Sequence, residues 1–269
     1  MKNHFTLITG ASKGFGKAMT LEFARRKMNL VLVALPHSGL KELSGFIENN
    51  FNIRVLYIEV DLTKVESYYK VSDFVKDNDI ELKYLVNNAG VLSRGFFEDL
   101  SDEFVLKQIE VNVLAPTLLI KLLLDNLKKN APAGILNVSS MAGFFALPNK
   151  QVYGATKAYL LSFSKSLRKE LKKDKITVTT VCPGGLNTTA KLCYQNRIVN
   201  WITRESVLSP ENAAIIAIDG MLNGQNVIIP GFVNKCFKFI DKIIPEYIKD
   251  KMIKREIEKF ETISFGLKP

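Results

Sequence analysis

The sequence predicts an α/β protein built on one doubly wound parallel sheet of about seven strands, with helices on both faces. Short, continuously apolar runs alternate with helical patterns along most of the chain. Strands of a parallel sheet are buried on both faces and are therefore apolar without a break. A glycine-rich turn also follows the first apolar run, and polar or glycine-containing segments follow several others.

The predicted strands are runs of four to seven residues, most of them rich in Val, Ile, Leu, Tyr or Phe. In chain order they are Phe5–Thr9, Asn29–Ala34, Arg54–Val60, Tyr84–Asn87, Ile135–Val138, Ile176–Val181 and Asn226–Pro230. Each strand is followed by a turn signal or a polar residue, which marks its end.

The predicted helices lie between these strands. The first follows the glycine turn, with apolar residues Leu21, Phe23, Ala24 and Met28 at helical spacing. The others are Gly39–Asn49, Ser67–Asn78, Glu103–Leu127, Gln151–Lys172 and Pro210–Leu222. No linker-like stretch or internal repeat divides the pattern, so residues 1–232 are expected to form one domain.

Composition is that of a globular protein, with 47% apolar and 24% charged residues in 269. The formal net charge is +10. Between Lys121 and Lys175, eleven Lys or Arg stand against three acids. An anionic partner, such as a nucleic acid or an acidic carrier protein, would explain this surplus. A solvated helix face is favoured, because the aromatic-basic interleaving of nucleic-acid surfaces is missing.

The three cysteines, Cys182, Cys193 and Cys236, have no metal-ligand spacing, and no metal is expected. We interpret them as free thiols in a reducing compartment, which favours a cytoplasmic location. No signal peptide is recognised. The longest apolar stretch, Val111–Leu124, is too short and too polar to span a bilayer.

Five polar or glycine-rich segments come directly after predicted strands. They are the Gly10 loop, Asp61, Asn88, Ser140 and Pro183-Gly184. Ligands of open parallel sheets bind at the carboxyl ends of the strands, so these segments are expected to converge on one site.

The first of these segments reads Thr9-Gly10-Ala11-Ser12-Lys13-Gly14-Phe15-Gly16. Glycines let the backbone approach a phosphate, and the following helix offers free N–H groups at its N-terminus. A simple tight turn is the alternative. The flanking strand and helix favour a dinucleotide site.

A second candidate site lies in the helix that begins at Gln151. Tyr153 and Lys157 are four residues apart and share one helix face. An ammonium near a phenol favours the phenolate, which would lower the tyrosine pKa and make it a usable acid and base. By itself the pair is weak evidence, and a half-buried Tyr beside a solvated Lys would be the preferred interpretation without the other motifs.

Taken together, these motifs resemble the short-chain dehydrogenase/reductase family over about Phe5–Pro230. The matching positions are Thr9, Gly10, Gly14 and Gly16, Asn87–Gly90, Asn112, Ser140, Tyr153, Lys157, Pro183-Gly184 and Thr188. The resemblance implies a Rossmann-like fold and hydride transfer between a nicotinamide and a carbonyl or alcohol carbon.

The resemblance also implies roles for individual residues. Tyr153 would donate a proton to the carbonyl oxygen, and Ser140 would hold that oxygen. Lys157 would lower the Tyr153 pKa and hold the ribose, and Asn112 would anchor a water. The implied cofactor contacts are Gly10, Ser12, Lys13, Gly14, Phe15, Gly16, Asp61, Leu62, Asn88, Ala89, Gly90, Tyr153, Lys157, Pro183, Gly184 and Thr188.

The region after the second strand favours NADP over NAD. It reads Leu35-Pro36-His37, without the acid that NAD-preferring members use for the ribose 2′-hydroxyl. Lys13 stands where NADP-preferring members carry a basic residue. The Arg that many of them add after the second strand is missing, and His37 or Lys41 could substitute for it. NAD remains possible.

The substrate is expected to be an apolar ketone, such as a 3-oxoacyl or steroid-like compound. Asn187–Ser206 lies where the family places a substrate lid, and it is mostly apolar. Phe96, Phe97, Phe144, Phe145 and Leu147 could add apolar walls. Ordinary core packing explains the same residues equally well.

Residues 233–269 form a predicted helical extension, with apolar residues such as Val233, Phe237 and Ile240 at helical spacing. Its near balance of charge favours packing over the pocket or against another subunit rather than on a membrane surface. By analogy with the family, a homodimer or homotetramer is expected.

Three other functions are considered. They are an NAD-dependent alcohol dehydrogenase, a non-catalytic nucleotide-binding protein of the same fold, and a nucleic-acid binder. A non-catalytic protein would be expected to have lost motif residues, whereas Asn112, Ser140, Tyr153 and Lys157 all match. A nucleic-acid binder predicts steep salt dependence. The NADP-dependent reductase is favoured.

Overall fold

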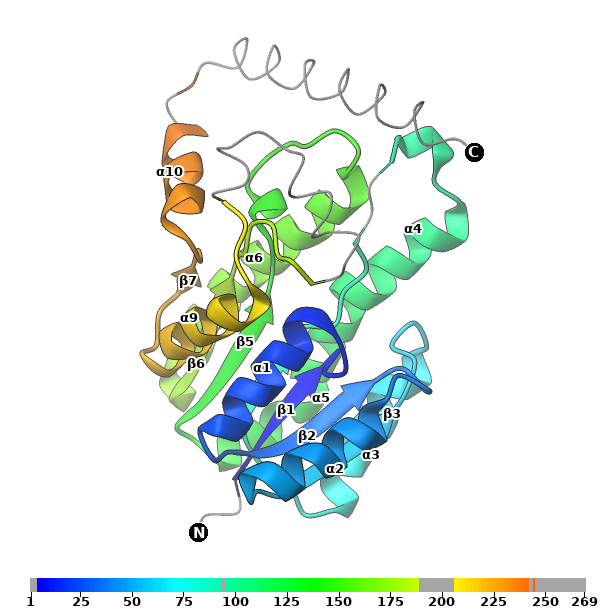
Figure 1. Ribbon diagram of the computed structural model, residues 1–269, viewed down its shortest axis with the longest axis vertical. Coiled ribbons are helices and arrows are strands. Elements are labelled where there is room, and N and C mark those ends of the chain that lie inside the picture. The colour runs from blue at the N-terminus through cyan, green and yellow to red at the C-terminus, as the bar shows by residue number, and fades with distance from the viewer. Residues whose placement is uncertain (1–3, 93–94, 189–205, 242–243, 245–269) are drawn as a thin grey trace.

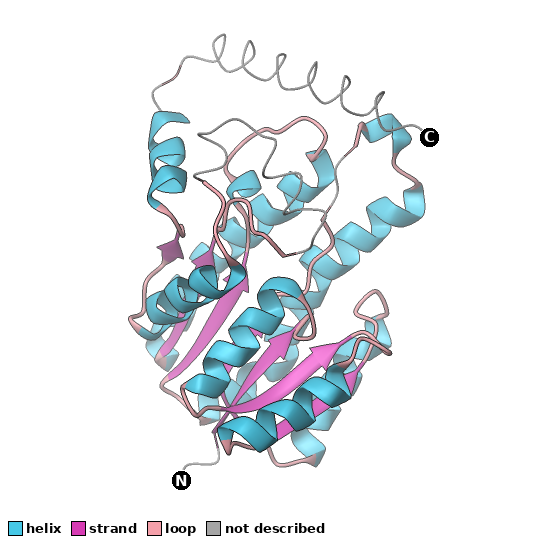
Figure 2. Ribbon diagram, viewed as in Figure 1, coloured by secondary structure: helices cyan, strands magenta, loops and turns pink. Residues whose placement is uncertain are grey.

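The computed structural model describes residues 4–92, 95–188, 206–241 and 244. In these residues a seven-stranded sheet runs in the order β3-β2-β1-β4-β5-β6-β7, and all neighbouring strands are parallel. The strands are β1 His4–Thr9, β2 Asn29–Ala34, β3 Val55–Glu59, β4 Glu81–Asn87, β5 Ala133–Val138, β6 Ile176–Val181 and β7 Val227–Ile228. The predicted doubly wound sheet is confirmed (Figure 2).

Helices connect the strands as predicted. They are α1 Gly14–Arg25, α2 Leu40–Phe51, α3 Val65–Asp77, α4 Asp102–Ile109, α5 Ala115–Lys129, α6 Gln151–Leu171, α9 Pro210–Leu222 and α10 Phe232–Asp241. Two apolar cores separate them into layers. Helices α1, α2 and α9 cover one face of the sheet, and α3, α5 and α6 cover the other (Figure 1).

The predicted helix Glu103–Leu127 is interrupted in the structure. A π-helical stretch, Glu110–Leu114, separates α4 from α5. Pro116 in the first turn of α5 has no N–H to donate, which disfavours a continuous α-helical ladder across this point. The wider turn carries Asn112, and such π-bulges often occur at functional sites.

The strand order places a topological switch between β1 and β4. From β1 the chain builds outward through β2 and β3, and from β4 it builds the other way. The connections after β1 and β4 therefore leave the sheet toward opposite faces, and a crevice opens at their carboxyl ends. These ends face the upper part of Figure 1.

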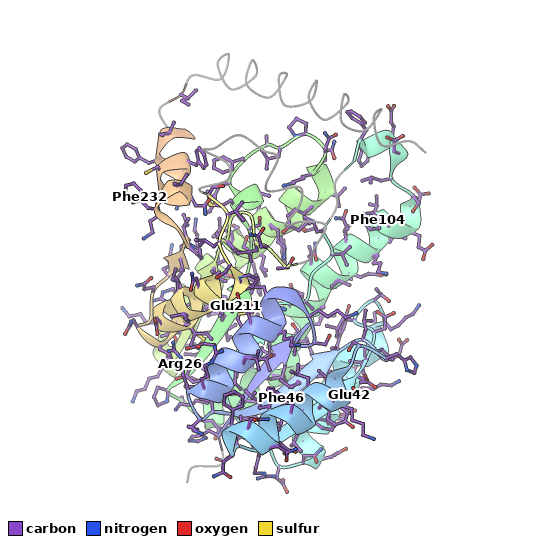
Figure 3. All side chains as sticks on the ribbon, viewed as in Figure 1. Arg26, Glu42, Phe46, Phe104, Glu211 and Phe232 are labelled. Carbon is purple, nitrogen blue, oxygen red and sulfur yellow. The ribbon has the colours of Figure 1, made fainter. Side chains whose placement is uncertain are left out.

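The start of the C-terminal extension packs on the domain as helix α10. Asn234 is buried, and its Nδ2 donates to the backbone oxygens of Pro230 and Ser206 at 2.9 Å each. Phe237 packs on a small apolar cluster around Met141 and Cys182. Phe232 projects outward and is 80% exposed (Figure 3). The division at residue 232 remains a prediction, and most of 242–269 lies outside the described residues.

Two of the three cysteines can be placed. Cys182 is buried and Cys236 is half-buried, and neither forms a disulfide. Cys193 lies outside the described residues. Within the described ranges, none of the helices combines the length and apolar character that crossing a bilayer demands.

Candidate active site

The glycine turn after β1 lies against the loop that follows β4. Gly10 has a φ of +65°, and a Cβ at this position would lie 2.9 Å from the Ala89 Cα and from Asn88 Nδ2. Neither the backbone conformation nor the space admits a side chain here. The turn is thus pressed against the edge of β4.

Thr9 and Asn88 join these two loops by hydrogen bonds. The Thr9 Oγ1 accepts bonds from the backbone N–H groups of Asn88 and Ala89, both at 3.0 Å. The Asn88 Nδ2 donates to the Thr9 backbone oxygen at 2.9 Å. Thr9 and Asn88 therefore fix the loops after β1 and β4 against each other. Thr9 belongs to the glycine motif recognised in the sequence, but the motif does not predict that its hydroxyl joins these two loops.

The N-terminus of α1 is open toward the crevice. Lys13 precedes the helix without a side-chain cap, and the first turn carries no acid. Gly14, at a φ of +52°, faces Thr188, whose Cβ would lie 3.2 Å from a Cβ at this glycine. Phe15 and Gly16 are buried. Uncapped N–H groups at a helix N-terminus form a site for an anion such as a phosphate.

The remaining predicted cofactor residues lie at neighbouring strand ends. Asp61 caps its own loop by accepting a 3.0 Å bond from the Thr63 N–H, and Leu62 is buried beneath it. The Pro183 backbone oxygen accepts a 2.9 Å bond from the Met141 N–H. That bond joins the loops after β5 and β6, which carry Ser140 and Gly184.

Lys157 lies in α6, one turn beyond Tyr153, and is only 3% exposed. Its Nζ donates a 2.9 Å bond to the Val138 backbone oxygen at the end of β5. The same Nζ lies 5.7 Å from the centre of the Tyr153 ring. Lysine and tyrosine thus share one helix face, as predicted, and the ammonium is anchored to the sheet.

The pKa of Tyr153 departs from the sequence-based expectation. Burial raises its pKa above the ordinary 10.0, and a hydrogen bond with Ser140 opposes that rise. The predicted lowering of the Tyr153 pKa by Lys157 is not found, and burial also lowers the pKa of Lys157 itself to about 8. In the protein alone, Tyr153 is a protonated acid that contacts Ser140.

Asn112 is buried in the π-helical stretch and is fully engaged by its neighbours. Its Oδ1 accepts a 2.8 Å bond from the Val91 N–H, and its Nδ2 donates to the Val91 oxygen and the Thr156 Oγ1. The predicted anchoring of a water by Asn112 therefore stays a prediction. Thr156 is a supporting residue that the motif search missed, since nothing in the sequence marks it.

Gly90 brings these groups together. A Cβ at Gly90 would lie 3.3 Å from both the Asn112 Oδ1 and the Lys157 Nζ. Ser140 contacts Tyr153, and Tyr153 lies beside Lys157. The structure therefore gathers all four predicted catalytic residues at the carboxyl edge of β4 and β5, next to the Gly10 turn.

The end of β2 carries no acid, as the sequence indicated. Leu35, Pro36 and His37 are exposed after Ala34. Ser38 follows, and within the described residues its buried hydroxyl oxygen finds no hydrogen-bond partner. This hydroxyl lies just before the N-terminus of α2, next to Gly39.

The expected apolar substrate walls are placed only in part. Phe144, Phe145 and Leu147 line a pocket of about 680 Å³ together with Ala155 and Ala158 of α6. At 100° per residue, these alanines lie well away from the Tyr153 face of the helix. Neither Ser140 nor Tyr153 lines this pocket. Residues 189–205 of the expected lid lie outside the described residues.

Comparison with known proteins settles the family. The family model described as short chain dehydrogenase matches residues 4–195. The chain belongs to this short-chain dehydrogenase family. The resemblance inferred from the sequence motifs is thus confirmed, and these motifs lie within or just beside the crevice described above.

Three similar proteins illustrate the family. The very-long-chain 3-oxoacyl-CoA reductase of Rattus norvegicus is 33% identical over 66% of this chain, an alignment that covers 58% of the reductase. The 17-beta-hydroxysteroid dehydrogenase 13 of the same organism is 28% identical over 96% of this chain and 83% of its own length. A short-chain dehydrogenase from Sphingobium yanoikuyae, solved in complex with NADPH, has a TM-score of 0.77, is 27% identical and covers 91% of this chain and 95% of its own.

Proposed function

We propose that this short-chain dehydrogenase is an NADPH-dependent reductase of an apolar ketone. The observation that carries the proposal is the cluster of Ser140, Tyr153, Lys157 and Asn112 around Gly90. Their polar groups converge beside a glycine turn and an open helix N-terminus that fit a dinucleotide pyrophosphate.

The bound nicotinamide would supply the hydride for the carbonyl carbon. The developing charge on the carbonyl oxygen needs a proton donor placed in advance. Tyr153 keeps its proton because burial raises its pKa, so it can serve as that donor. Ser140 holds the oxygen by a second hydrogen bond. Lys157, anchored on Val138, holds the ribose side of the cofactor and stabilises the resulting phenolate.

Three observations support NADP over NAD. The β2 end lacks an acid for the ribose 2′-hydroxyl. Lys13 is exposed in the glycine turn, directly before α1. The buried Ser38 hydroxyl, which has no hydrogen-bond partner among the described residues, can donate to a 2′-phosphate. The Sphingobium yanoikuyae relative was solved with NADPH. Comparison of the Michaelis constants for NADPH and NADH tests this choice, and a preference for NADH would contradict it.

An apolar substrate is supported by the surroundings of Ser140. Directly after it, Met141 joins Cys182 and Ile229 in an apolar cluster, against which Phe144, Phe145 and Phe237 pack. The names of the two rat relatives point to 3-oxoacyl and steroid ketones. We therefore propose a ketone with a long acyl or polycyclic apolar body.

We also propose a homo-oligomer. Leu106, Ile109 and Leu114 are exposed by 57, 38 and 39% along α4 and the π-helical stretch that follows it, and Tyr159 of the adjacent α6 is 39% exposed. Together these side chains give the helix layer an apolar outer face that a second copy can cover. A cytoplasmic location, suggested by the free thiols, also remains a proposal.

The test compares two tyrosines of the same helix. In Tyr153→Phe we expect kcat to fall about a thousandfold for NADPH oxidation with a panel of apolar ketones, because the proton donor is lost. The Kd for NADPH, measured by fluorescence, should change little. Tyr159→Phe is the matched control, since its hydroxyl contacts only Thr117, at 3.1 Å, among the bonds described. Unchanged turnover in Tyr153→Phe would refute the proposal.

A further inference from the structure

A cleft with five cationic side chains lies at the far end of α6 from Tyr153. Its volume is about 680 Å³. The cationic residues that line it are Lys165, Arg168, Lys169, Lys172 and Lys175. Pro132, Ile176, Thr177 and Asn226 complete its walls. The cleft lies at the amino ends of β5 and β6, the opposite edge of the sheet from the catalytic residues.

The charge in this cleft is not neutralised by neighbouring acids. No acidic residue lines it. Among the described residues, none of its five cations takes part in an ion pair, and the adjacent Asp174 is paired with Lys128 at 3.4 Å. Five like charges around one concave surface repel one another, and an anion between them would relieve that repulsion.

Arg168 is held in a fixed position inside the cleft. Its two terminal nitrogens donate to the backbone oxygens of Val178 and Gly224 at 2.9 and 2.6 Å. These bonds use two of its five N–H donors and leave the charge uncompensated by any carboxylate. The guanidinium is therefore oriented before a ligand arrives, whereas the surrounding lysines are exposed and can adjust.

The carboxyl end of α6 accounts for only part of this arrangement. The negative end of the helix dipole, equivalent to about half a charge, favours cations in the last turn. The five positive charges are several times larger than the half charge of the helix end. They also extend beyond the helix to Lys175 at the start of β6. The excess charge remains available for a ligand.

We propose that this cleft binds a ligand that carries two or more phosphate groups on a small apolar body. Lysine and arginine are the usual partners of phosphate oxygens. The volume is in the range of small-molecule sites, and Pro132 and Ile176 supply an apolar wall. The phosphate groups belong to a free metabolite of nucleotide size or to a phosphorylated lipid headgroup.

Calorimetric titration with inorganic pyrophosphate and with ATP tests the proposal. Saturating NADPH is present, so that the dinucleotide crevice does not compete. We expect saturable binding of one ligand per chain. In a variant with Lys165→Gln, Lys169→Gln and Lys172→Gln, affinity should fall about tenfold or more, because three of five charges are removed. The matched control carries Lys70→Gln, Lys76→Gln and Lys107→Gln, three exposed lysines elsewhere, and should bind like the wild type.

The two phosphate sources are separated with vesicles. Phosphatidylcholine vesicles with and without a phosphorylated inositol lipid are sedimented with the same three proteins. Binding only to the phosphorylated vesicles, lost in the cleft variant alone, assigns the phosphates to a lipid headgroup. As a measurement on the wild type, pyrophosphate should protect Lys165, Lys169 and Lys172 from acetylation, read by mass spectrometry. Equal weakening in both variants, or no saturable binding to either source, overturns the proposal.

Discussion

The Nζ of Lys157 donates a 2.9 Å hydrogen bond to the backbone oxygen of Val138, the last residue of β5. Lys157 carries the one positive charge among the four residues predicted to be catalytic, and this bond directs its ammonium toward the sheet. Because the lysine is almost fully buried, desolvation disfavours its charged form and lowers its pKa from 10.5 to about 8. The geometry of the candidate site therefore has a cost in stability that depends on pH.

The first prediction concerns that pH dependence. Unfolded Lys157 binds its proton up to pH 10.5, and folded Lys157 only up to about 8. Between these values the unfolded state holds more protons, so the free energy of unfolding rises with pH. Across this window, the free energy of unfolding of the wild type should rise by up to roughly 3 kcal/mol relative to that of Lys157→Met. The lysine pKa falls from 10.5 to about 8, and each pH unit between them is worth about 1.36 kcal/mol.

Urea unfolding of both proteins without dinucleotide, at several pH values from below 8 to 10.5, measures this difference. Cys182, whose pKa burial raises to about 12, contributes with the opposite sign in both proteins, and Lys157 opposes that rise, so the difference reports the lysine together with its effect on Cys182. A difference that stays flat across the window would contradict the lowered lysine pKa.

A second prediction compares two glycines. Gly10→Ala should lower the free energy of unfolding by about 1–3 kcal/mol, because Gly10 has a positive φ and no room for a methyl group. NADPH binding should weaken as well, since the turn must move away from Asn88. Gly45→Ala in α2 is the control. Its Cβ would meet nothing within 4 Å, so we expect a gain of about 0.5–1 kcal/mol. Thermal unfolding and NADPH fluorescence measure both effects.

A third prediction concerns Asn112. Asn112→Leu should cost about 1–3 kcal/mol of stability, because the half-buried N–H of Val91 loses its partner and the Val91 oxygen keeps only the 3.4 Å bond from Gln108 Nε2. It should also lower kcat, because the loop that carries Gly90 would no longer be fixed beside Lys157. Full kcat at reduced stability would show that Asn112 acts only in folding. Kinetics at a temperature where the variant is folded distinguishes the two results.

A fourth prediction concerns the attachment of α10. Asn234→Ala should destabilise the protein by about 1–3 kcal/mol, since it removes the two buried hydrogen bonds that Asn234 donates to the backbone oxygens of Pro230 and Ser206. Asn50→Ala is the control. Asn50 donates a similar bond, to Phe46 at 2.7 Å, on an exposed surface where water can replace it. If both variants lose the same stability, the bonds of Asn234 do not fix α10.

Local patterns were enough to predict the sheet and most of its helices. The predicted bounds of β2 and β6 agree with the structure to the residue. Strands buried on both faces of a sheet are apolar at nearly every position, so such runs are easily recognised in a sequence. The interruption at Glu110–Leu114 differs from the predicted continuous helix, because the apolar pattern runs on through it although Pro116 has no N–H to donate. The shortening of β7 was also missed, because an edge strand is limited by its one neighbour, β6.

The chemical groups of the candidate site, and the strand ends that carry them, can be predicted from residue order and from the geometry of parallel sheets. Their pKa values and orientations depend on the folded chain. Burial raises the Tyr153 pKa where the helical spacing suggested a lowered one, and the bond to Val138 directs Lys157. Desolvation and long-range hydrogen bonds depend on what the rest of the chain packs against each residue, and a local pattern does not contain that information.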